Sequence, residues 1–143
     1  MQIKVRKMIP EAAMIERDEM MIPMLNACPS FEPMWVGFLN EWRGQGEVPV
    51  YIALGGLARH LVATLANGDI ATLSAVFKVV ERWLLEGSHY VREAASLRLL
   101  ENLQNESLHE TTRPEDFERF LMPESLKWWR NVERFWRRGR RDS

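Results

Sequence analysis

Three histidines and one cysteine are the side chains of this 143-residue chain best suited to bind a metal or to catalyse a reaction. The segment HETTR begins at His109 like the HExxH motif of zinc proteases, but Arg113 stands where the second histidine ligand belongs. The other two histidines are not spaced to share a helical face with His109 or with each other, and zinc needs ligands that converge. The sequence therefore predicts no metal site and no cofactor.

Cys28 and the pair Gly55–Gly56 are better explained by structure than by chemistry. A nucleophilic cysteine needs a neighbouring base or cation that lowers its pKa, and nothing adjacent to Cys28 provides one, so we interpret it as a small buried hydrophobe. A phosphate loop would need a strand before the glycines and a Lys–Ser/Thr pair after them. We therefore expect a protein that is not an enzyme. An enzyme with an unrecognised site is a second alternative, and it requires at least two of the following residues in one pocket: His60, Glu41, Glu81 and Cys28.

Charge is distributed unevenly along the chain although its net charge is only −1. Residues 1–9 contribute +3 and residues 127–143 contribute +5, so the body between them carries −9. An acidic surface attracts a basic partner and speeds its capture through electrostatic steering. The first functional hypothesis is therefore a protein-binding module, and its predicted partner-binding residues are Glu81, Glu86, Glu93 and Glu101.

The C-terminal segment combines tryptophan and arginine, the residue types that dominate protein interfaces. Arginine also neutralises nucleic-acid phosphates, so binding of nucleic acid or of an anionic surface is the alternative function. We rank it second because the acidic body would repel a polyanion. The residues of this alternative site are Trp128, Arg130, Arg134, Arg137 and Arg138.

Three amphipathic helices are predicted between about residues 50 and 103, each with one apolar face. Gly68 ends the first and Asp69 caps the second; Gly87 ends the second and Ser88 caps the third. Because the turns are short, the three helices are expected to pack as antiparallel neighbours. Their predicted buried faces are Leu54, Leu57, Leu61 and Leu65; Leu73, Val76, Phe77, Val80 and Leu84; and Val91, Ala95, Leu99 and Leu103.

The remaining segments predict shorter helices and no strand of useful length. A helix is expected from about residue 10 to 26, a second one capped by Ser30, and a third that starts near Pro114. The last helix starts near Pro123, with an inner stripe of Leu126, Trp129, Val132 and Trp136. The predicted fold is all-α: one domain over residues 1–143, either a helical bundle or a short solenoid-like array of antiparallel helices. A loose arm at about residues 1–9 and a basic tail at about residues 137–143 complete it.

Two further observations concern the surroundings of the protein. A single cysteine cannot form an internal disulfide, and no apolar run has the length of a signal peptide or a membrane span. We therefore expect a cytoplasmic protein without a membrane span.

The segment from about residue 69 to 104 resembles a HEAT-type helical hairpin, on the strength of Val91–Arg92, Ala94–Ala95 and the spaced leucines that follow. The whole chain resembles small uncharacterised bacterial all-helical proteins that carry a CPSF segment (residues 28–31) and a proline-marked Leu/Trp-rich helix at the end. Some small helical proteins of this kind are immunity proteins that neutralise a toxin. This resemblance implies that the partner is another protein, such as a toxin, and the acidic body of the chain indicates that a toxin bound there would be basic.

Overall fold

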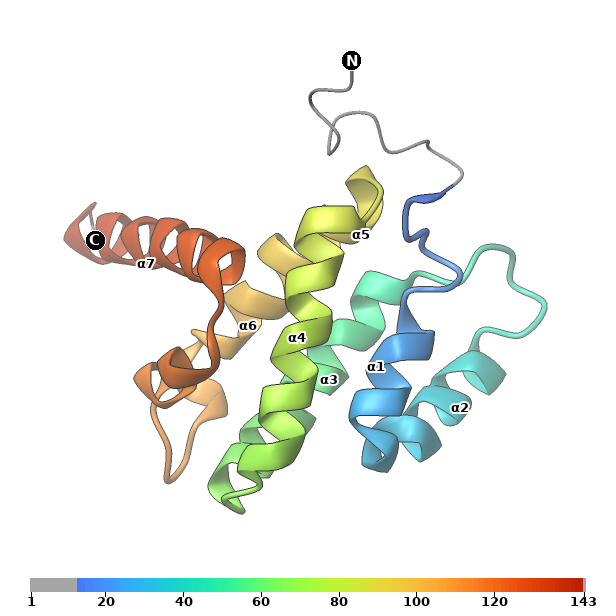
Figure 1. Ribbon diagram of the computed structural model, residues 1–143, viewed down its shortest axis with the longest axis horizontal. Helices are drawn as coiled ribbons and strands as arrows, with labels where there is room; N and C mark the ends of the chain where they lie inside the picture. Colours follow the sequence, from blue (N-terminus) through green and yellow to red (C-terminus); the bar gives the residue numbers. More distant parts are fainter. Residues whose placement is uncertain (1–12, 143) are drawn as a thin grey trace.

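A computed structural model describes residues 13–142, with side chains as far as Trp136. This part forms helices around one hydrophobic core, which confirms the all-α, single-domain prediction (Figure 1). Its elements are α1 (Met21–Ala27), η3 (Pro29–Phe31), α2 (Glu32–Glu41), α3 (Val50–Ala66), α4 (Ile70–Glu86), α5 (His89–Glu93), η4 (Ala94–Leu100), α6 (Glu101–Leu103), η5 (Glu106–Leu108), η6 (Pro114–Phe120) and α7 (Pro123–Asp142). The predicted arm at residues 1–9 lies outside the described residues, and the basic segment predicted at residues 137–143 continues α7 as far as Asp142.

The predicted central helices are confirmed as α3, α4 and the continuous helix formed by α5, η4 and α6. Every leucine of the first predicted face is buried, as are all five apolar residues of the second. Gly68 takes a positive φ of 75°, a conformation that glycine adopts without strain. Asp69 caps α4, because its carboxylate accepts hydrogen bonds from the backbone N–H (3.2 Å) and the hydroxyl (2.7 Å) of Thr72.

The third central helix contains a π-helical stretch, η4, that the apolar spacing did not predict. The Ser96 hydroxyl donates to the Arg92 carbonyl (2.8 Å), and the Asn102 side chain donates to the Arg98 carbonyl (2.6 Å), so side chains occupy two carbonyls of this helix. Helices α3, α4 and α7 all contact η4, which explains why five of its seven residues are buried.

Gly87 ends α4 for a different reason from the one expected. Its φ of −79° and ψ of 157° are open to any residue, so backbone freedom is not what requires glycine. Glycine is required because there is no space for a side chain. A Cβ at this position would lie 2.5 Å from Val91 Cγ1, 2.8 Å from Val91 Cβ and even closer to the carbonyl oxygen of Trp83. The close approach lets α5 turn directly back against the end of α4.

Glu81 joins α4 to the start of α7. Its side chain is only 6% exposed, and its two carboxylate oxygens accept the backbone N–H groups of Glu124 (2.7 Å) and Ser125 (2.8 Å). These donors belong to the first turn of α7, where a helix has no internal acceptors for them. Glu81 therefore acts as an N-terminal cap supplied by another helix, and its predicted place on an exposed acidic surface is wrong.

Two predictions near the N-terminus are also wrong. Within the predicted helix of residues 10–26, residues 13–16 are not α-helical, residues 17–20 form turns, and α1 begins only at Met21. Ile15 instead pairs with the turn after α4, through hydrogen bonds from its N–H to the Glu86 carbonyl (3.0 Å) and from the Ser88 N–H to its carbonyl (2.9 Å). Ser30 caps no helix, because its hydroxyl contacts His60.

The stripe predicted for α7 is correct except at its first residue. Trp129 and Val132 are buried and Trp136 is half-buried, whereas Leu126 faces outward and Ser125 takes the inner position beside Glu81. Among the described helices, none has both the length and the apolar composition needed to cross a bilayer.

Candidate partner-binding site

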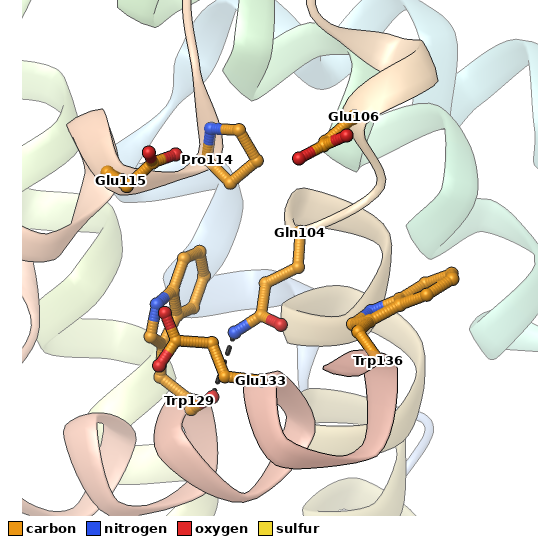
Figure 2. A pocket seen from close by; sticks show the side chains of 7 residues that line it. All are labelled: Gln104, Glu106, Pro114, Glu115, Trp129, Glu133 and Trp136. Carbon is orange, nitrogen blue, oxygen red and sulfur yellow. Dashed lines mark hydrogen bonds between the residues drawn. The ribbon is translucent and has the colours of Figure 1, made fainter. Parts of the chain in front are cut away.

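A pocket of about 190 Å³ lies beside α7, between the end of α6 and η6 (Figure 2). Three separate segments build its wall, and they are brought together only by the fold. The lining residues are Gln104, Glu106, Pro114, Glu115, Trp129, Glu133 and Trp136.

Helical spacing and two side-chain hydrogen bonds position the segments that build this pocket. Trp129, Glu133 and Trp136 follow one another at steps of four and three residues, so they share one face of α7. Gln104 ties α6 to that helix, since its side-chain amide donates to the Trp129 carbonyl (2.8 Å). His109 holds the loop between η5 and η6, where its Nε2–H donates to the Leu103 carbonyl (3.0 Å).

The two tryptophans contribute hydrogen-bond donors that the fold does not use. Trp129 is only 1% exposed and Trp136 is half-buried, and the indole Nε1 atom of each is shielded from solvent. Neither Nε1–H has a hydrogen-bond partner among the described residues. Buried donors are normally satisfied in folded proteins, so two unsatisfied donors on residues that line one pocket are an unusual feature of this site.

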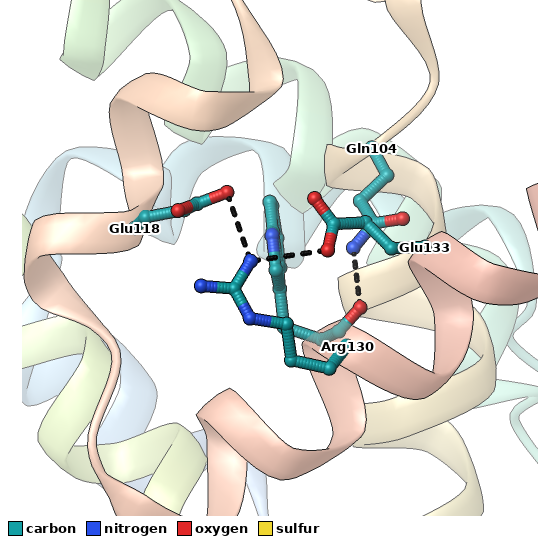
Figure 3. A network of polar contacts seen from close by, with 5 residues as sticks. Gln104, Glu118, Arg130 and Glu133 are labelled. Atoms are coloured by element: carbon teal, nitrogen blue, oxygen red, sulfur yellow. Dashed lines mark hydrogen bonds and ion pairs between the residues drawn. The ribbon is translucent and has the colours of Figure 1, made fainter.

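The charged residues that line the pocket are all acidic. Glu106 and Glu115 are exposed and form no ion pair within the part of the chain that the structure describes. Glu133 accepts a hydrogen bond from Arg130 (3.0 Å), whose guanidinium also lies 3.4 Å from Glu118 (Figure 3). The hydrogen bond to Glu133 and the nearby charge of Glu118 raise the pKa of Arg130.

The structure places the predicted acidic surface in several locations rather than one. Glu81 is buried, Glu86 pairs with Arg82 (3.6 Å) on α4, and Glu93 lies beside His89 (3.4 Å) on α5. Glu101 lies half-buried at the start of α6. None of the four lines the pocket beside α7.

Sequence reasoning missed the three glutamates that do line this pocket, although a signal for them existed. Residues 101–118 hold six acidic residues and one basic residue, the densest negative stretch in the chain. That stretch directly precedes the tryptophan-rich helix. The sequence placed the negative charge in the whole body of the chain and predicted the tryptophan stripe, but nothing in it indicated that residues 101–118 and that stripe share one pocket.

The alternative basic and aromatic site is not assembled among the described side chains. Trp128 packs partly against the core, Arg130 bridges two carboxylates, and Arg134 donates to the side chain of Asn131. Arg137 and Arg138 belong to α7, but their side chains lie outside the described part of the chain.

Two of the four residues named for an unrecognised enzyme site come near each other. Ser30 Oγ lies 2.7 Å from His60 Nε2 and 3.6 Å from Cys28 Sγ, and burial lowers the pKa of His60. Glu41 lies on the exposed end of α2 and Glu81 caps α7, so neither joins this group. Within the described residues no carboxylate bonds to the second nitrogen of His60, so the group is a Ser–His pair and not a triad.

A second hollow, of about 490 Å³, separates α2 from α3 and has an apolar character given by Phe31, Met34, Phe38 and Ile52. No residue of α2 is buried, and its aromatic residues stack along the helix, with Trp35 and Phe38 centroids 5.8 Å apart.

The described residues contain no group of three or more His, Cys, Asp or Glu side chains arranged to hold a metal ion.

Comparison with known proteins adds a family but no activity. Residues 21–137 match the model of a family described as a domain of unknown function, DUF7674. No curated protein and no solved structure matches the chain. The match runs from the first residue of α1 into the last turns of α7, so it includes every residue that lines the pocket. This chain therefore belongs to the DUF7674 family.

Proposed function

We propose that this protein is a binding module that captures a basic partner protein at the pocket beside α7. One observation carries the proposal: two tryptophans whose buried indole N–H groups have no partner among the described residues line a pocket whose charged residues are all glutamates. Tryptophan is among the residues that contribute most to protein interfaces. Carboxylates at the rim attract a basic partner over distances of about 10 Å at moderate salt.

The finer form of the proposal is an immunity-type protein that neutralises a basic toxin in the cytoplasm. It rests on the resemblance to small bacterial helical proteins and on the acidic pocket. The HEAT-like hairpin, which corresponds to α4 and the helix that follows it, serves in this proposal as the rigid frame against which α7 is held. Catalysis has no part in it, since neither Ser30 nor His60 lines the pocket beside α7.

The test starts with capture and is decided by reconstitution. The tagged full-length protein is recovered from its native host at low salt, the co-purifying protein is identified, and both are purified separately for titration calorimetry. We expect Glu106→Gln/Glu115→Gln to weaken the complex about tenfold or more, because it removes the two lining carboxylates that form no ion pair with any described residue.

Two control variants separate the pocket from general charge. Glu110→Gln removes one charge from the loop between η5 and η6 but none from the pocket lining. Glu93→Gln/Glu101→Gln removes two charges from the acidic surface that the sequence predicted as the partner-binding site. Each should change the affinity less than about threefold. Equal losses in all variants, or recovery of nucleic acid in place of a protein, would refute the proposal. For the finer form, the purified partner must also lose its toxic activity when the complex forms.

A further inference from the structure

We infer that the group the pocket receives is an arginine side chain of the partner. This inference rests on the proposed function and specifies the chemistry of the site. An inserted group must face glutamates from two different segments, Glu106 of η5 and Glu115 of η6, so it must be a cation. Figure 2 shows these two carboxylates on opposite sides of Pro114, with the indoles of Trp129 and Trp136 below them.

The shape of the wall selects a guanidinium over an ammonium group. Two indoles and a proline ring give the pocket flat, apolar surfaces. A guanidinium is planar and weakly hydrated, so it stacks on aromatic rings while its edge donates to carboxylates. A lysine ammonium is compact and strongly hydrated, and it would lose its water against these walls without matching their shape.

The chain already holds one guanidinium between two glutamates close to this pocket. Arg130 lies between Glu118 of η6 and Glu133 of α7, at 3.4 Å and 3.0 Å (Figure 3). Glu115 precedes Glu118 by three residues, on the pocket side of η6. The pocket thus offers an incoming arginine two carboxylates, as Arg130 already has, and one of them comes from η6 in both cases.

The unused indole donors specify what accompanies the guanidinium. A guanidinium has only donors, so it cannot satisfy Trp129 Nε1–H or Trp136 Nε1–H. A main-chain carbonyl of the segment that carries the arginine can accept from such a donor once the indole turns toward the bound segment, because both Nε1 atoms are shielded from solvent in the unbound protein. The expected ligand is therefore an arginine within a peptide chain, which presents donors to the glutamates and acceptors to the indoles.

The experiment uses the full-length protein and small probes, so it does not depend on finding the partner. N-acetyl-arginine methylamide, its lysine counterpart and its uncharged citrulline counterpart are titrated while indole N–H signals are followed by NMR. The chain has six tryptophans, and Trp129→Phe and Trp136→Phe assign the two signals of interest. We expect arginine to shift both signals with a Kd of about 1 mM, with lysine and citrulline at least about fivefold weaker.

Matched variants make the result specific to the pocket. Glu106→Gln/Glu115→Gln should weaken arginine binding about fivefold or more, and Glu110→Gln should leave it unchanged. Equal shifts with lysine, shifts confined to other tryptophans, or no shift at saturating probe would overturn the arginine assignment. None of these results would affect a partner complex that still depends on Glu106 and Glu115. Conversely, selective arginine binding without any partner complex would leave the pocket assignment intact and remove the proposed function.

Discussion

Replacing Glu81 by alanine should cost more stability than replacing any exposed glutamate of the chain. The side chain makes two short hydrogen bonds, of 2.7 Å and 2.8 Å, from a nearly fully buried carboxylate to the first turn of α7. A hydrogen bond to a charged group contributes about 1.5–3 kcal/mol, and alanine would leave both N–H groups buried without an acceptor. The expected loss in free energy of unfolding is about 3–5 kcal/mol, a large share of the roughly 5–15 kcal/mol of a typical domain.

The measurement is urea unfolding followed by tryptophan fluorescence, with hydrogen exchange at the amides of Glu124 and Ser125. Glu81→Gln keeps one acceptor oxygen and should lose about 1.5–3 kcal/mol, so the effect stays measurable even where the alanine variant does not fold. Glu86→Ala on the same helix removes only an exposed pair with Arg82 and should lose less than about 1 kcal/mol. If the variants at positions 81 and 86 lose equal stability, or if exchange at the start of α7 does not change, Glu81 is not its cap.

Three further changes test other parts of the fold. Gly87→Ala should destabilise the protein by about 1–3 kcal/mol in urea unfolding, because the new Cβ would lie 2.5 Å from Val91 Cγ1; a neutral effect would show that the α4–α5 turn can open. Asp69→Ala should cost about 1 kcal/mol through the lost cap on Thr72, and Asp69→Asn should restore most of it; equal losses would assign the effect to something other than the cap. Burial lowers the pKa of His60, so the unfolded chain binds a proton at this residue more readily and the stability should fall as pH drops below about 6.5. If the midpoint of thermal unfolding depends on pH as steeply in His60→Asn as in the unsubstituted protein, this expectation is refuted.

The central helices were predictable because local signals agree there. Leucines at steps of three and four, glycine at the end of α3 and aspartate at the start of α4 all indicate the same boundary. Burial of Leu54, Leu57 and Leu61 follows directly from their spacing, since one face of a helix must pack inward. In this part of the chain, propensity, capping and burial require nothing from distant residues.

The missed features all depend on contacts between distant segments. Glu81 reads as one more solvent-facing glutamate, because the N–H groups it accepts lie 43 and 44 residues further along the chain. Ile15 lies within a helical pattern, yet its backbone pairs with the turn after α4. Gly87 was located correctly, but the crowding by Val91 that requires glycine is visible only in three dimensions.

The candidate site was only partly predictable, because its residue types can be read from the sequence but the contacts that bring them together cannot. Composition indicated an acidic partner surface, and spacing placed Trp129 and Trp136 on one face of the last helix. Neither could show that the loop before η6 folds back over that face, which depends on the Gln104 contact with α7. The charge prediction was therefore assigned to glutamates of α4, α5 and α6 instead of those that line the pocket.

The π-helical segment η4 also fixes the phase of everything that follows it in its helix. A π-helical turn is closed by an i→i+5 hydrogen bond and holds one residue more than an α-helical turn, so converting η4 to an ordinary α-helix without a deletion would turn Gln104 by about 100° from its direction relative to Val91. The amide of Gln104 would then miss the Trp129 carbonyl, although no residue would have been added or removed. The π-helical geometry between residues 94 and 100 is thus a determinant of the pocket, and a comparison of DUF7674 sequences should find that any length change inside this helix is the loss of one residue from this stretch.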